Sequence, residues 1–115
     1  MQPALAAYLF LAIAIVFEVT GTAMLVKTEQ FTRLVPTISV VLLYGISFYF
    51  LSLSLKVIPV GIAYAIWSAV GIVCIAVIGL IFFKQSLDLP AVIGIGLIIS
   101  GVLVINLLSK SVTHG

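Results

Sequence analysis

The sequence predicts an all-α integral membrane protein in which residues 1–115 form a single domain of four transmembrane helices. Hydrophobic residues make up 64% of the chain and charged residues only 7%, whereas a soluble domain carries about 25% charged residues. The apolar residues fall into four runs of about 20 residues, which is the length that a helix needs to cross a bilayer. The expected spans are residues 4–26, 34–55, 60–83 and 90–108.

The first span contains one carboxylate, Glu18, near its centre. A charge at that depth costs about 2.5–3.5 kcal/mol on insertion scales, and such groups usually mark proton or ion pathways. Helical spacing places Leu11, Ala14, Gly21 and Thr22 on the same face, where small residues allow close approach. Because no other residue of the span is ionisable, we expect Glu18 to have no partner within it. The alternative is a protonated carboxyl group that only bonds to a neighbouring helix.

The second span starts with Pro36 in its first turn, where a missing N–H costs little. Tyr44, Ser47 and Phe48 share one face of this helix. Tyr44 lies near mid-depth, where its phenol needs a hydrogen-bond partner. It is therefore a candidate site residue, with packing in the core as the alternative.

The third span follows Pro59 and carries a stripe of polar, aromatic and small residues. Its members are Tyr64, Trp67, Ser68 and Gly71. Trp67 is the only tryptophan of the chain, and it lies deeper than the interfacial belt that tryptophan usually occupies. Its π-face could hold an organic cation, and packing is again the alternative.

The fourth span begins at Pro90, with Asp88 placed near the positive end of the helix. It has no charged and no aromatic residue, so it is a poor candidate for the site. Gly94 and Gly101 lie on one face, and small residues so arranged let helices pack closely. We interpret this span as an association surface, with packing inside one protomer as the alternative.

The charges barely specify an orientation in the membrane. Four spans put both termini on one side, together with Lys56 and Lys110, while Lys27, Arg33 and Lys84 lie on the other. The excess of Lys and Arg that normally fixes topology is therefore only one residue. Insertion in both orientations, followed by antiparallel pairing, is the arrangement that this balance permits. The net charge of +2 is spread over loops and indicates no nucleic-acid partner.

Several kinds of chemistry are missing from the sequence. The single Cys74 and the single His114 are far apart and cannot build a metal site. There is no glycine-rich phosphate loop and no histidine within the spans that could activate a serine. We therefore expect no enzyme activity, no metal and no cofactor. His114, in the terminal tail, is expected to be solvated.

Several segments together resemble the small multidrug resistance family of bacterial exporters, in its quaternary-ammonium branch. They are Phe17-Glu18-Val19, Gly21-Thr22, Glu29 to Leu34, Pro59 to Ser68, Leu87 to Ala91 and Gly101 to Ser109. The resemblance implies a four-helix protomer that forms an antiparallel, dual-topology homodimer in the bacterial inner membrane. It also implies exchange of H⁺ for lipophilic cations in multidrug efflux, driven by the proton gradient with no cofactor.

The resemblance also assigns roles to single residues. Glu18 matches the carboxylate that binds both proton and substrate. The matching substrate-binding residues are Tyr44, Tyr64, Trp67, Leu11, Ala14, Ser47 and Phe48. Gly94 and Gly101 match the dimer interface. One departure is Ala69-Val70-Gly71, where the family has Gly-Val-Gly at a hinge, and we expect the alanine to stiffen this bend and slow switching.

Other functions remain open at this point. A sister branch exports guanidinium-type cations, and its pattern has a tryptophan shortly after the carboxylate of the first span. The segment from Val19 to Thr22 has no tryptophan, which favours the drug-cation branch. Export of guanidinium or polyamines by the same fold is therefore the alternative among transporters. A proton-carrying subunit of a rotary machine and a non-transporting structural membrane subunit are the alternatives outside that class.

Overall fold

The computed structural model describes residues 2–110, and His114 lies outside this range. Four helices follow one another: α1 (Pro3–Lys27), α2 (Leu34–Ser54), α3 (Val60–Phe82) and α4 (Leu89–Leu108). Each is long and apolar enough to cross a membrane. The expected four-helix, all-α fold is thereby confirmed, and the helix ends differ from the expected ones by at most one residue.

Local sequence signals explain where the helices begin. Pro3 opens α1, and Pro59 precedes α3, which are positions where a missing backbone N–H does not weaken the helix. Asp88 caps α4, because its carboxylate accepts a hydrogen bond of 3.0 Å from the backbone N–H of Ala91. Pro90 follows in the first turn of the same helix.

The turn between α1 and α2 is held by Thr28, which is only 1% exposed. Its hydroxyl donates to the Leu25 carbonyl at 2.7 Å and accepts from the Phe31 N–H at 3.2 Å. Glu29, Gln30 and Phe31 have φ values of 49°, 60° and 64°, a left-handed conformation that non-glycine residues adopt at a cost. The buried Thr28 hydroxyl stabilises this turn and so fixes how α1 returns into α2.

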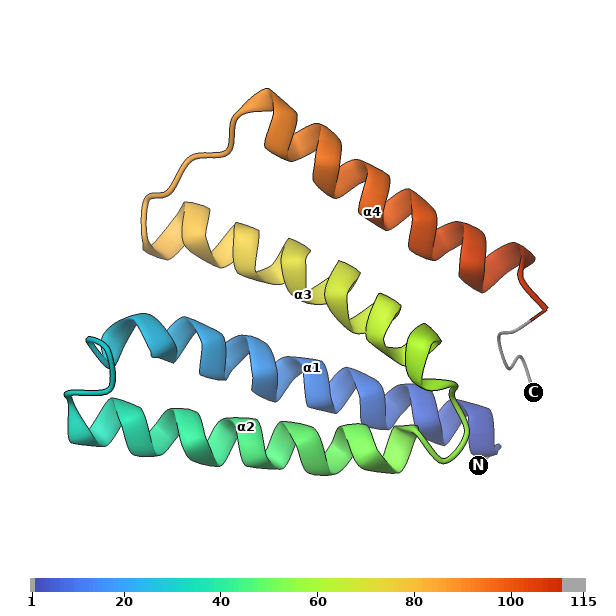
Figure 1. Cartoon of the computed structure of the whole chain (residues 1–115), viewed down its shortest axis with the longest axis horizontal. Coiled ribbons are helices and arrows are strands. Elements are labelled where there is room, and N and C mark those ends of the chain that lie inside the picture. Colours follow the sequence, from blue (N-terminus) through green and yellow to red (C-terminus); the bar gives the residue numbers. More distant parts are fainter. Residues whose placement is uncertain (1, 111–115) are drawn as a thin grey trace.

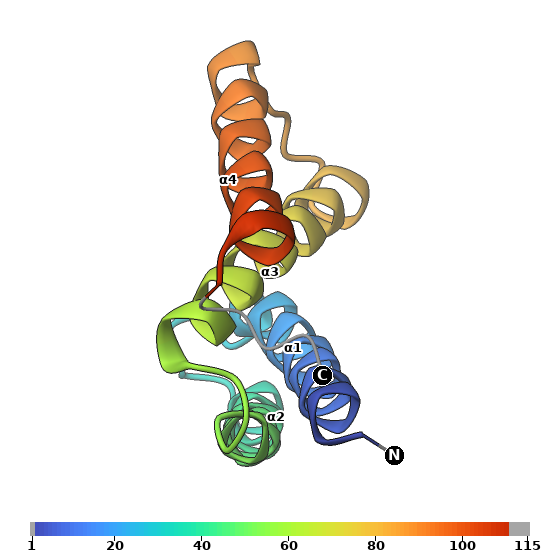
Figure 2. The same cartoon turned by 90° about the vertical axis from the view of Figure 1, so that its right-hand side faces the viewer.

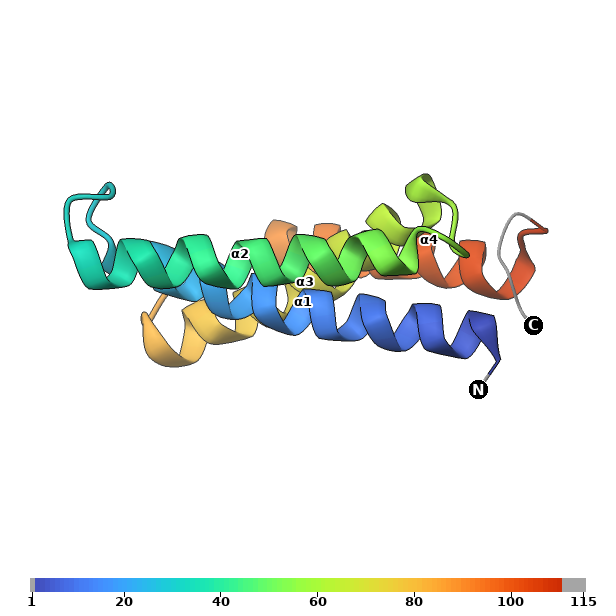
Figure 3. The ribbon, with the colours of Figure 1, turned by 90° about the horizontal axis from the view of Figure 1, so that it is seen from below.

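The helices lie in the spatial order α2, α1, α3, α4 (Figure 1). α1 and α2 run side by side in opposite directions along most of their lengths (Figure 3). α3 packs on α1, and their contact forms the core. The buried core residues are Ala7, Leu11, Ile15, Val19, Ile58, Ala63 and Trp67. The start of α1 and the end of α4 lie at the same end of the molecule (Figure 1), as four successive spans require.

α4 packs on α3 and diverges from α1 and α2 (Figure 2). None of its residues is buried. A methyl group added at Gly94 or at Gly101 would meet no atom within 4 Å. The glycine face that the sequence marks as an association surface is therefore open in a single protomer and is not used for packing within it.

Candidate functional site

Glu18 occupies α1 at mid-length, and its side chain is half-buried. One carboxylate oxygen, Oε1, accepts a hydrogen bond of 3.0 Å from the hydroxyl of Thr22. The other oxygen, Oε2, is buried and has no hydrogen-bond partner among the residues described. The expectation that Glu18 has no partner within its span was wrong, because Thr22 follows four residues later and a hydroxyl on the same face can reach the carboxylate.

Tyr44 of α2 completes a hydrogen-bonded chain to Glu18. Its phenol oxygen lies 2.7 Å from the Thr22 hydroxyl. The ring lies against the backbone of α1 at Gly21, where an added methyl group would come within 2.7 and 2.8 Å of ring atoms Cε1 and Cδ1. Tyr44 thus has the partner that its depth demands, and a glycine allows the ring to approach.

Ser47 connects α2 to α1 one turn before Glu18. Its hydroxyl donates a 2.7 Å hydrogen bond to the backbone carbonyl of Ala14, and both residues are almost completely buried. A buried hydroxyl needs such a partner, since leaving it unpaired costs about 1–3 kcal/mol. Ser47 therefore fixes the register of the two helices beside the carboxylate.

Two adjoining cavities meet at Glu18. The first measures about 260 Å³ and is lined by Glu18, Tyr44, Ser47, Phe48, Leu51, Tyr64 and Trp67. The second measures about 310 Å³ and is lined by Glu18, Tyr64, Trp67, Ser68, Gly71, Ile72 and Ile75. They share a carboxylate and two aromatic rings, and neither is lined by a Lys or Arg side chain. We refer to them together as the carboxylate cavities.

The aromatic residues differ in how they are held. Trp67 is 8% exposed and lies in the core, whereas Tyr64 is 68% exposed and Phe48 is 59% exposed. The rings of Phe48 and Trp67 are 6.0 Å apart between centroids. The carboxylate cavities therefore have a rigid wall at Trp67 and an open side at Tyr64 and Phe48. A carboxylate beside aromatic faces is suited to a lipophilic cation, which gains both charge pairing and cation–π attraction.

Leu11 and Ala14, which the sequence also proposes as lining, do not border the carboxylate cavities. Ala14 is completely buried, and its carbonyl accepts from Ser47. Leu11 is 1% exposed and contacts a different cavity, between other faces of α1 and α3. Gly94 and Gly101 lie on α4, outside both carboxylate cavities. The remaining proposed residues come together around Glu18.

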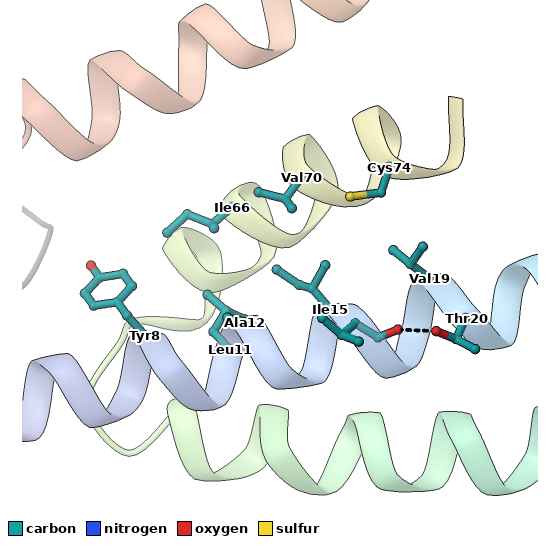
Figure 4. A pocket seen from close by; sticks show the side chains of 10 residues that line it. Tyr8, Leu11, Ala12, Ile15, Val19, Thr20, Ile66, Val70 and Cys74 are labelled. Atoms are coloured by element: carbon teal, nitrogen blue, oxygen red, sulfur yellow. Dashed lines mark hydrogen bonds between the residues drawn. The ribbon is translucent and has the colours of Figure 1, made fainter. Parts of the chain in front are cut away.

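A further cavity, between α1 and α3, measures about 390 Å³, and we call it the apolar cavity (Figure 4). It is lined by Tyr8, Leu11, Ala12, Ile15, Val16, Val19, Thr20, Ile66, Val70 and Cys74. Its Thr20 hydroxyl is bonded to the Val16 carbonyl of its own helix at 2.8 Å (Figure 4). The apolar cavity shares no residue with the carboxylate cavities.

Sequence reasoning missed Thr22 as the partner of Glu18, although it placed Thr22 on the same face. The available signal was the combination of a hydroxyl four residues after a carboxylate and a mid-depth tyrosine that needs a partner. It also missed the apolar lining residues Leu51, Ile72 and Ile75, which carry no distinguishing pattern. Within residues 2–110, no three His, Cys, Asp or Glu side chains are grouped as metal ligands.

Residues 6–98 match the family model described as Small Multidrug Resistance protein. The quaternary ammonium compound-resistance protein QacF of Klebsiella aerogenes is 57% identical over 107 residues, covering 93% of this chain and 97% of the relative. The corresponding protein QacE of Escherichia coli is 54% identical with the same coverage. The multidrug transporter EmrE of Escherichia coli K12 is 52% identical, again over 93% of this chain and 97% of its own length.

Proposed function

Because this chain belongs to the small multidrug resistance family, we propose that it exports lipophilic quaternary-ammonium cations in exchange for protons. Its relatives are transporters and not enzymes, and it is a multi-pass protein of the bacterial inner membrane. The observation that carries the proposal is the buried Oε2 of Glu18, which has no hydrogen-bond partner among the described residues. Glu18 itself lines both aromatic-lined cavities.

A single carboxylate gives a simple mechanism of exchange. The oxygen either binds a proton or faces an organic cation, so the two ligands compete for one site. A charged group in a membrane interior is costly without a partner, and each ligand neutralises it. If the site opens to one side of the membrane at a time, an inward proton gradient releases the cation outside. The apolar walls, with Trp67, Tyr64 and Tyr44, favour lipophilic cations with little further selectivity.

Glu18 provides the direct test. We would measure uptake of an aromatic quaternary-ammonium cation into proteoliposomes under a pH gradient. The native protein should transport it, and Glu18→Gln should reduce the exchange to the level of empty liposomes, because an amide cannot exchange a proton. Glu18→Asp keeps the carboxylate and should retain part of the activity.

Three results would contradict the proposal. Gradient-driven transport by Glu18→Gln would show that another group couples the proton. Transport of guanidinium or polyamines in place of the aromatic cation would assign the chain to the other transporting branch. If the protein assembled normally but transported no cation, the result would favour a non-transporting structural subunit.

The proposal includes an antiparallel homodimer. Tyr64 and Phe48 are largely exposed on the open side of the site, and a second copy would cover them. α4 buries no residue, and the Gly94 and Gly101 face has no atom against it within the protomer. These open surfaces, together with the balanced charges on the two sides, support a pair of oppositely oriented protomers.

The glycine face of α4 can be blocked without touching the site. The substitution Gly101→Leu should raise the dissociation constant of the dimer by about ten-fold, because the α4 helices could no longer approach closely. Gly96→Leu is the matched control, because Gly96 also has open space around it but lies on another face of α4. Light scattering in detergent measures both. Equal dimer fractions for the two variants would exclude this surface.

A further inference from the structure

The two carboxylate oxygens of Glu18 have different surroundings. Oε1 accepts the Thr22 hydroxyl at 3.0 Å, while Oε2 is buried with no hydrogen-bond partner in the described chain. We propose that Thr22 is a positioning residue that holds Oε1 through a chain from Tyr44, so that Oε2 alone exchanges its proton for the cation. This inference rests on the proposed function, because it concerns the same carboxylate.

The direction of the chain follows from counting protons. The Thr22 hydroxyl has one proton, which it donates to Oε1. Its 2.7 Å contact with the Tyr44 phenol must then be one in which Tyr44 donates and Thr22 accepts. The two bonds point the same way and end on a carboxylate, so each polarises the next. The chain is strongest when Glu18 is ionised.

Gly21 explains why the chain forms here. A methyl group at this position would lie within 2.8 Å of two ring carbons of Tyr44, a separation at which one group must move. The absence of a side chain lets the ring lie on α1 with its hydroxyl beside Thr22. The sequence Gly21-Thr22 therefore acts as one unit, in which the glycine admits the ring and the threonine passes its hydrogen bond to Glu18.

Oε2 is on the side of α3. A methyl group at Gly71 would lie 3.6 Å from Oε2, so this oxygen faces α3. Trp67 and Ser68 of α3 line the same cavity, but no side chain of the described residues donates to Oε2. The titratable side chains that line the cavities beside Glu18 are Tyr44 from α2 and Tyr64 from α3, and no Lys or Arg lines them. A proton or a cation can therefore reach Oε2 without breaking the bonds to Oε1.

The test measures how protons displace a bound cation. We would titrate binding of tetraphenylphosphonium to the purified full-length protein as a function of pH. Thr22→Val keeps the shape but removes the donor to the ionised carboxylate, which then binds a proton more readily. The pH at which half the cation is displaced should rise by about one unit, equivalent to about ten-fold in proton competition. Thr22→Ser keeps the hydroxyl and should restore the native midpoint.

Thr20→Val is the matched control. It removes the same kind of hydroxyl from the same helix, but that hydroxyl donates to the Val16 carbonyl and not to Glu18. Its midpoint should equal that of the native protein. A Thr22→Val midpoint equal to that of Thr20→Val would overturn the inference, and so would a Thr22→Ser protein that behaves like Thr22→Val.

Gly21→Ala and Tyr44→Phe test the same chain without altering Thr22. Each removes the Tyr44 donation, and each should move the midpoint in the same direction by less than Thr22→Val does. If Thr22→Val does not fold, these two variants still test the hydrogen-bonded chain. Unchanged midpoints in both variants would contradict the proposed role of that chain.

If cation binding to the native protein does not depend on pH, the proposed exchange function itself fails. A pH-dependent native protein with an unshifted Thr22→Val refutes only the role of Thr22.

Discussion

The contact between α1 and α3 borders two kinds of cavity that differ in chemistry more than in size. The apolar cavity is the larger, at about 390 Å³, and has no charged residue in its lining. The carboxylate cavities, of about 310 and 260 Å³, share Glu18, Trp67 and Tyr64. Both kinds border α1 and α3, and the 260 Å³ cavity also borders α2. The neighbouring residues Ile66 and Trp67 line different kinds of cavity.

This difference shows that volume does not identify the site in a membrane protein. An apolar hollow within the bilayer offers a lipophilic ligand little that acyl chains do not already offer. Selection requires a group whose charge is costly in that environment. Of the two kinds of cavity compared, the carboxylate cavities contain such a group, so the proposed function is placed there.

The largest effect that separates the two kinds of cavity is expected from adjacent residues of α3. Trp67→Ala removes an aromatic wall of the carboxylate cavities and should weaken cation binding by about 30-fold, equivalent to the ~2 kcal/mol of a desolvated cation–π contact. Ile66→Ala truncates the neighbouring side chain in the apolar cavity and should change affinity by less than about three-fold. Calorimetric titration with tetraphenylphosphonium measures both.

Trp67 is also a core residue, so Trp67→Ala removes core packing as well as an aromatic wall. A second, conservative variant is therefore needed to separate these two effects. Trp67→Phe retains a ring and should lose only part of the affinity. Equal losses for Ile66→Ala and Trp67→Ala would mean that both variants act through general packing, and the distinction between the cavities would fail.

A smaller effect is expected from thiol protection. Cys74 is the single cysteine of the chain and lines the apolar cavity. A cation at about ten times its dissociation constant should slow labelling by about ten-fold at Ser68→Cys in a Cys74→Ser background, by mass action. Labelling of the native Cys74 should be unaffected if the cation occupies the carboxylate cavities, as proposed. Mass spectrometry with a membrane-permeant maleimide gives both rates.

Protection of Cys74 from labelling would contradict the proposed difference between the two kinds of cavity. It would place the cation, or a movement that it causes, in the apolar cavity. Lack of protection at residue 68 would remove Ser68 from the site and would leave the Glu18 and Trp67 measurements to define its extent.

Local features of the sequence predicted the architecture and most of the residues that gather around Glu18 in the candidate site. Runs of about 20 apolar residues specify four spans because the bilayer thickness fixes how long a helix must be. Glu18 is recognisable because a carboxylate within such a run is costly and rare. Tyr44 and Trp67 are recognisable by their depth. None of these inferences needs to know which helix packs on which.

Tertiary structure alone decided what these residues contact. The Thr22–Tyr44 pair spans 22 residues of sequence, and the Ser47–Ala14 bond spans 33. The sequence grouped Leu11 and Ala14 with Glu18 on one helical face, yet they border other neighbours, because a face of α1 is wide enough to meet two helices. Rotation and register between helices depend on close contacts such as that of Tyr44 with Gly21. Helical periodicity therefore gives the face on which each residue lies. Only packing between helices determines which residues it contacts, and so gives the two oxygens of Glu18 different surroundings.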